Sequence, residues 1–146
     1  MSDATSTPPL SDASSPANRA VLTRFAPLFA FDLDVLLVVI FAVTGRASHA
    51  EVLDVPGVWS TAWPFLVGLA LSWAATRAWR RPLGVVWPGL VLWVGTVVIG
   101  MLGRVAIQGR DFKPSFLIVT TLFVGAGMFG WRLAARGGPA AARRRG

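Results

Sequence analysis

The sequence contains no cysteine, no tyrosine and a single histidine, His49. Without cysteine, the chain cannot form a disulfide, ligate an iron–sulfur cluster or use a thiol nucleophile. A single histidine also excludes bis-histidine haem and multi-histidine metal sites within one subunit. We therefore expect no metal site and no cofactor.

Charged residues are also scarce, at 14% of the 146 residues, whereas hydrophobic residues make up 54%. Soluble domains typically carry about 25% charged residues, and their cores rarely contain long uninterrupted apolar blocks. The composition therefore predicts a polytopic membrane protein. The net charge of +7 comes mostly from arginines at the ends of the apolar blocks. Because these arginines form no basic surface interleaved with aromatic side chains, we expect no nucleic-acid partner.

Four apolar segments are long enough to cross a bilayer, which takes about 17–25 helical residues. They cover Phe25–Thr44, Val58–Thr76, Pro82–Gly103 and Pro114–Trp131. We therefore predict an all-α, integral membrane four-helix bundle over residues 25–135. A Ser- and Pro-rich tail, residues 1–24, is predicted to be disordered. A basic tail, residues 136–146, follows the bundle.

Basic residues divide unequally between the two sides of the predicted bundle. Ten lie on the side that holds both termini, and four lie on the other: Arg46, Arg104, Arg110 and Lys113. Since Lys and Arg are enriched in cytoplasmic loops, both termini are predicted to be cytoplasmic. We expect a multi-pass protein in the lipid bilayer of the bacterial plasma membrane. Small-residue helix faces also favour a homo-oligomer or a complex with another membrane protein.

Asp32 and Asp34 lie inside the first apolar segment, where carboxylates are costly and commonly functional. Two residues apart on a helix, they project about 200° from one another, which excludes a paired acid–base site on one face. Two central aspartates would cost about 5–7 kcal/mol, against about 4–8 kcal/mol contributed by the apolar residues of the segment. A helix shifted outward reduces this cost. Asp32 then lies near the cytoplasmic interface, and Asp34 faces the bundle interior.

Small and hydroxyl-bearing residues recur at helical spacing on all four segments. Close helix packing is the main interpretation, and its candidates are Gly45, Gly68, Ser72, Gly100 and Gly127. The alternative is a polar path, for which the intramembrane candidates are Asp34, Thr96 and Thr120. A direct ion pair between Asp34 and Arg104 is not expected, because the helix rise separates them by about 15 Å.

Arg46, His49 and Arg104 form a predicted polar cluster at the outer ends of the helices. Either the arginines extend to the lipid headgroups, as Lys and Arg at helix ends usually do, or the cluster suits an anion or a lipid phosphate. The chain has no nucleophile elbow, no phosphate-binding Gly loop and no HExxH motif. We therefore expect no catalytic residue and no enzyme.

Four stretches of the sequence carry a family resemblance: FDLDVLLVVIFAVTGRASH, TAWPFLVG, GTVVIGMLGR and FGWR. Together they resemble the bacterial and archaeal membrane family known as domain of unknown function 3054. The resemblance covers about residues 32–133 and implies a small four-helix inner-membrane protein. It implies no activity, substrate or catalytic residue. The matching stretches contain Asp34, Gly45, Arg46, His49, Pro64, Gly68 and Arg104.

Two functions fit these features. The first is a small transporter-like component that moves a proton or small ion, with Asp34 as the intramembrane carboxylate. The second is a non-transporting structural or accessory subunit of a membrane complex, in which Asp34 pairs between helices. A membrane enzyme is the least favoured, since no acid–base pair can be placed on one helix face.

Overall fold

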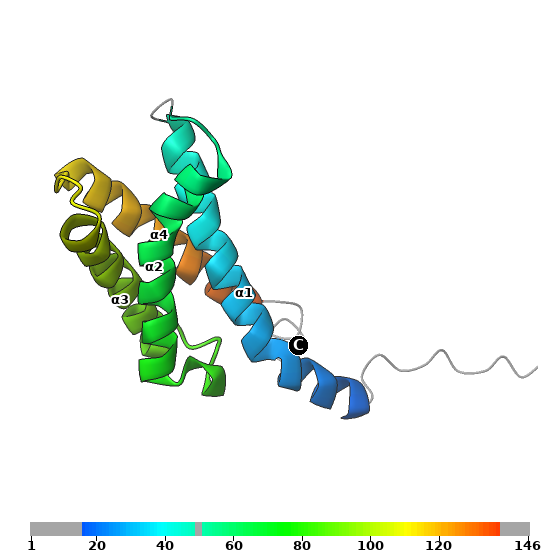
Figure 1. Cartoon of the computed structure of the whole chain (residues 1–146). Coiled ribbons are helices and arrows are strands. Elements are labelled where there is room, and N and C mark those ends of the chain that lie inside the picture. The colour runs from blue at the N-terminus through cyan, green and yellow to red at the C-terminus, as the bar shows by residue number, and fades with distance from the viewer. Residues whose placement is uncertain (1–15, 49–50, 138–146) are drawn as a thin grey trace, which may run out of the picture.

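Four long helices make up the bundle, and none of the described residues forms a strand (Figure 1). The computed structural model describes residues 16–48 and 51–137, and for residues 16–23 it describes only the backbone. The long helices are α1 Pro16–Ser48, α2 Val55–Thr76, α3 Leu90–Leu102 and α4 Pro114–Arg136. Short helical turns lie beside them: η1 Ala78–Arg80, η2 Val85–Gly89 and η3 Gly103–Ile107.

The helices correspond to the four predicted segments, and each is long and apolar enough to cross a bilayer once η2 and η3 are joined to α3. The predicted all-α membrane bundle is therefore confirmed, and the chain is a multi-pass membrane protein. Several helix ends differ from the predicted bounds by a few residues, and the start of α1 differs most. Helix α1 begins at Pro16, inside the stretch that sequence analysis assigned to the N-terminal tail. The rest of that tail, residues 1–15, and residues 138–146 of the C-terminal tail lie outside the described residues.

Local sequence explains where the helices begin and end. Asp54 caps α2, because its carboxylate accepts a hydrogen bond from the Gly57 backbone N–H at 3.1 Å. The same helix ends at Thr76, since Arg77 takes a left-handed backbone conformation with φ of 50°. Helix α4 begins with Pro114, a residue favoured in the first turn, where a missing N–H costs nothing.

Helices α2 and α3 pack closely because small residues face one another between them. A Cβ added at Gly100 would overlap the Phe65 ring, and one added at Gly68 would lie 3.0 Å from the Thr96 carbonyl oxygen. Gly68, Ser72 and Gly100 are all buried. These three predicted packing residues therefore lie in the α2–α3 contact, where a larger side chain would push the backbones apart.

Helices α1 and α4 also pack on one another, and the two glycines predicted there differ. Gly127 of α4 lies against Leu37 of α1, and a Cβ at Gly127 would overlap that side chain. Gly45 of α1 has no atom within 4 Å of the position that a Cβ would take. Gly45 therefore makes no close helix contact through its Cα face, although the next residue, Arg46, still lies against Gly57 of α2.

Four phenylalanines form the middle of the core. The rings of Phe41 and Phe65 meet edge to face with centroids 5.5 Å apart, and Phe41 lies 5.8 Å from both Phe116 and Phe123. Phe41 and Phe65 are almost completely buried. We call these four residues the aromatic layer. It lies between two polar clusters, one at each end of the bundle.

Candidate functional site

Asp34 is the centre of the polar cluster at one end of the bundle. Its side chain is fully buried, whereas Asp32, two residues earlier, is exposed. The Asp34 carboxylate accepts four hydrogen bonds from three side chains. Trp73 Nε1 donates to Oδ2 at 3.0 Å and Trp131 Nε1 donates to Oδ1 at 2.9 Å. Arg132 donates to Oδ1 at 2.9 Å and to Oδ2 at 2.6 Å. We call these four residues the Asp34 clamp.

Arg132 is as deeply buried as Asp34. Its two terminal nitrogens meet the two carboxylate oxygens in the bidentate geometry that Arg–carboxylate pairs prefer. Two further N–H groups are also used, because Nη1 donates a second hydrogen bond to the Met128 carbonyl at 3.1 Å and Nε donates to the Pro82 carbonyl at 3.3 Å. The Trp131 ring lies 4.5 Å from the guanidinium carbon. Asp34 of α1 therefore compensates the buried charge, and carbonyl groups of α4 and of the α2–α3 connection accept further hydrogen bonds from it.

The Asp34 carboxylate has no acceptor position left for a further partner. Two carboxylate oxygens offer about four lone-pair sites, and the four donors of the clamp occupy them. A carboxylate that exchanges protons or cations needs a free lone pair, and Asp34 has none in this arrangement. The geometry is that of a fixed link joining α1, α2 and α4.

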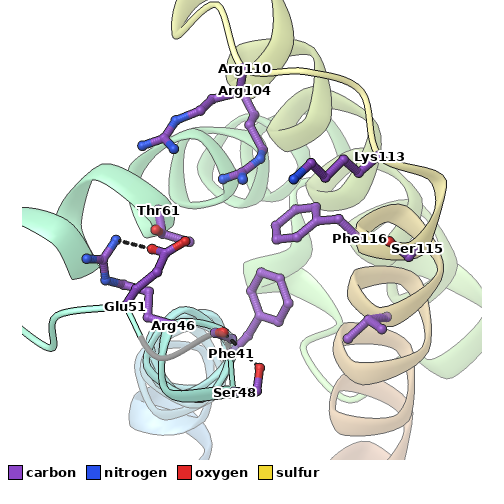
Figure 2. A pocket seen from close by; sticks show the side chains of 12 residues that line it. Phe41, Arg46, Ser48, Glu51, Thr61, Arg104, Arg110, Lys113, Ser115 and Phe116 are labelled. Carbon is purple, nitrogen blue, oxygen red and sulfur yellow. Dashed lines mark hydrogen bonds and ion pairs between the residues drawn. The ribbon is translucent and has the colours of Figure 1, made fainter.

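A cavity of about 510 Å³ lies at the opposite end of the bundle, beside the α1–α2 and α3–α4 connections (Figure 2). We call this cavity the pocket, and this end the pocket end. Its lining residues are Phe41, Gly45, Arg46, Ser48, Glu51, Thr61, Arg104, Arg110, Lys113, Ser115, Phe116 and Val119. Four of these side chains are basic and one is acidic, a net charge of +3. Two members of the aromatic layer, Phe41 and Phe116, line the inner part.

Arg46 is held by the connection that follows its own helix. Its Nη1 lies 2.7 Å from a Glu51 carboxylate oxygen (Figure 2). Its Nη2 lies 3.7 Å from a carboxylate oxygen of Asp54. Nε and Nη2 also donate to the Val52 carbonyl, at 3.1 and 2.6 Å. Arg46 therefore fastens the α1–α2 connection to the end of α1. Its charge is compensated within the protein, so it does not extend to lipid headgroups.

The other basic residues of the pocket have no such partner. The Arg104 guanidinium carbon lies 4.2 Å from the Phe116 ring centroid, a cation–π contact. In Figure 2, Arg104 and Lys113 are directed into the same space, and Arg110 lies at its edge. Among the described residues, no carboxylate oxygen lies within 4 Å of these three cations. Uncompensated positive charge in a concave site attracts anions. His49, the third member of the predicted outer cluster, lies outside the described residues.

A family model described as "Protein of unknown function (DUF3054)" matches residues 31–135. The chain belongs to this family. The resemblance found in the sequence is thus confirmed, and the DUF3054 match takes in the whole Asp34 clamp and every residue that lines the pocket. Searches of the curated proteins and of the solved structures find no match.

The other intramembrane candidates of this DUF3054 protein lie apart from the clamp. Thr120 precedes Arg132 by twelve residues on α4, which is about 18 Å along the helix axis. Its hydroxyl donates to the Phe116 carbonyl of its own helix at 2.7 Å. Thr96 is buried on α3, and its hydroxyl has no hydrogen-bond partner among the described residues. Asp34, Thr96 and Thr120 are therefore not joined into one polar path.

The sequence did not identify Arg132 as the partner of Asp34. Arg132 is one of the ten basic residues counted on the side of the termini, although its side chain is buried. Removing Arg132 leaves nine basic residues against four, so the predicted orientation does not change. One feature of the sequence did indicate a buried partner. Helix α4 ends at Arg136 and contains no acidic residue, and Arg132 lies a full turn before that end. Charged residues inside membrane helices usually pair with one another.

Proposed function

We propose that this DUF3054 protein is a non-enzymatic membrane protein that binds an anion in the pocket. The observation that supports this most is the group of three cations, Arg104, Arg110 and Lys113, with no carboxylate oxygen of the described residues within 4 Å. Small-molecule sites are typically cavities of about 300–1,000 Å³ with apolar walls and a few convergent polar groups. Arginine and lysine are the usual partners of phosphate and carboxylate groups.

In this proposal the Asp34 clamp is structural. Proton or ion transport through Asp34 is the competing function, and the presence of a buried intramembrane carboxylate favours it. Four donors saturate that carboxylate, however, and the aromatic layer lies between it and the pocket. A pH-driven flux in vesicles that is lost in Asp34→Asn, with the folded yield unchanged, would support transport instead.

We further propose that both termini face the cytoplasm of a bacterial cell, because nine basic residues besides Arg132 lie on their side and four lie on the other. The pocket would then open at the outer face of the plasma membrane. Four helices of this length rarely enclose a solute path alone, so we propose that the protein assembles with copies of itself or with another membrane protein.

Anion binding is testable by thermal unfolding of the detergent-solubilised protein. Sodium phosphate is expected to raise the unfolding temperature more than sodium chloride at equal ionic strength. A hydrogen bond to a charged group contributes about 1.5–3 kcal/mol, so Arg104→Gln should weaken phosphate binding at least about 10-fold. Arg80→Gln makes the same charge change at an exposed residue of the opposite end and should keep the wild-type response. Equal responses to phosphate and chloride would refute the proposal.

A further inference from the structure

We infer that the anion is the phosphate headgroup of a membrane lipid, which enters the pocket sideways between α1 and α4. This inference rests on the proposed function, because it names the class of molecule that the same pocket binds. Three features of the pocket support it: an opening toward the bilayer, an apolar inner wall, and basic residues at the depth of lipid phosphates.

The opening exists because α1 and α4 diverge toward the pocket end. Asp34 and Phe41 of α1 both contact α4, whereas Gly45, one turn farther along, has no atom within 4 Å of its would-be Cβ. Figure 1 shows α4 beginning well away from the end of α1 and approaching it farther along. The lining residues at this gap are exposed, namely Ser48 on α1 and Val119, 56% exposed, on α4. The side of the pocket that faces lipid is therefore not closed by the described part of the protein.

The walls of the pocket suit a molecule that has both a charged and an apolar part. Arg104 and Lys113 supply positive charge, and Phe41, Phe116 and Val119 supply apolar surface. The Phe116 ring also holds the Arg104 guanidinium over the cavity at 4.2 Å. A small inorganic anion would use only the charged part and would leave much of the 510 Å³ unfilled. A phospholipid would place its phosphate at the charged part and its acyl chains at the apolar part.

The basic residues also lie at a suitable depth. Helix α4 has 23 residues, about 35 Å at 1.5 Å per residue, so its ends reach beyond a hydrocarbon core of about 30 Å. Lys113 directly precedes this helix, and Arg110 lies in the same connection. Phe41 lies about 10 Å along α1 from Ser48. A phosphate held by the basic residues would therefore leave its acyl chains beside Phe41 and Val119.

Native mass spectrometry of the full chain in detergent can separate the contributions of the phosphate and of the acyl chains to binding, with three probes. These are dioleoyl phosphatidylglycerol, dioleoylglycerol, which has the same chains without the phosphate, and glycerol 3-phosphate, which has the phosphate without chains. We expect phosphatidylglycerol to bind at least about 10-fold more tightly than either of the others. Arg104→Gln should weaken that binding about 10-fold, and Arg80→Gln should leave it unchanged. If Arg104→Gln folds poorly, Lys113→Gln replaces it, because Lys113 lies in an exposed connection.

A second variant tests sideways entry. Gly45→Leu adds a side chain where there is free space, so it should fold normally and fill the gap between α1 and α4. It is expected to weaken phosphatidylglycerol binding and to leave glycerol 3-phosphate binding unchanged. Unchanged lipid binding in Gly45→Leu would contradict entry between these helices.

The remaining outcomes separate this inference from the proposed function. If glycerol 3-phosphate binds as tightly as phosphatidylglycerol, and Arg104→Gln weakens both, the pocket binds a soluble anion and the lipid inference is wrong. If dioleoylglycerol binds as tightly as phosphatidylglycerol, the phosphate is not recognised and the lipid inference is again wrong. If neither Arg104→Gln nor Lys113→Gln weakens the binding of any phosphate-bearing probe, both the inference and the proposed function fail.

Discussion

Replacing Asp34 with asparagine should destabilise the bundle severely. The substitution keeps the shape of the side chain but removes the charge that faces Arg132, which stays fully buried without a counter-charge. Removing one partner of a buried ion pair costs about 3–5 kcal/mol. The amide also offers one acceptor oxygen where four donors converge on two. The expected loss is a large part of the roughly 5–15 kcal/mol that stabilises a typical protein.

The measurement is an equilibrium unfolding titration with sodium dodecyl sulfate in mixed micelles, followed by tryptophan fluorescence. The chain contains seven tryptophans, and Trp73 and Trp131 belong to the clamp itself. Asp32→Asn is the matched control, since it makes the same chemical change on an exposed side chain and should unfold like the wild type.

A double variant sharpens the test. Replacing both partners of a buried ion pair with apolar residues of similar size is often neutral or stabilising. The double variant Asp34→Leu/Arg132→Met should therefore be clearly more stable than Asp34→Leu alone or Arg132→Met alone. Two results would refute this prediction. One is that Asp34→Asn has the same free energy of unfolding as the wild type, and the other is that the double variant is no more stable than the less stable of the two single variants.

Two further substitutions test helix packing in the same titration. Gly100→Leu should lower the free energy of unfolding by about 1–3 kcal/mol, because the new side chain would overlap the buried Phe65 ring. Gly45→Ala, placed in open space, is its control, and equal losses in the two variants would contradict the prediction. Trp93→Phe removes the hydrogen bond from Nε1 to the Thr121 carbonyl at 2.9 Å and should cost about 0.6 kcal/mol. A loss well above 2 kcal/mol would indicate a packing role for the indole instead.

The four helices could be predicted because the bilayer leaves few alternatives. A backbone in lipid has to satisfy its own hydrogen bonds, and a long apolar segment does so as a helix. The helix ends were less predictable. Helix α1 begins at Pro16, nine residues before Phe25, because a helix can include polar residues that precede the apolar segment. Apolarity therefore locates the part of a helix that lies in the membrane and not its full length.

The candidate sites were predictable only as far as local geometry reaches. Helical spacing alone separates Asp32 from Asp34, but Arg132 lies 98 residues away from Asp34 and is brought to it by packing. Its neighbour Trp131 also lies where an interfacial tryptophan would be expected, so the sequence pattern placed both residues at the membrane–water interface. In the same way, Arg46 was expected either to extend to lipid headgroups or to form an anion site with Arg104, but Glu51 and Asp54 compensate its charge.

The two polar clusters have complementary effects on the same pair of helices. The Asp34 clamp ties α1 to α4 at one end, and the aromatic layer keeps them in contact as far as Phe41. Beyond Phe41 the helices are free to diverge, and the pocket occupies the space between them. A buried ion pair is costly to form, and it is also highly directional, because the bidentate contact fixes how the two helices meet. The clamp therefore contributes to the pocket without lining it, by holding α1 and α4 at the angle that leaves the pocket open.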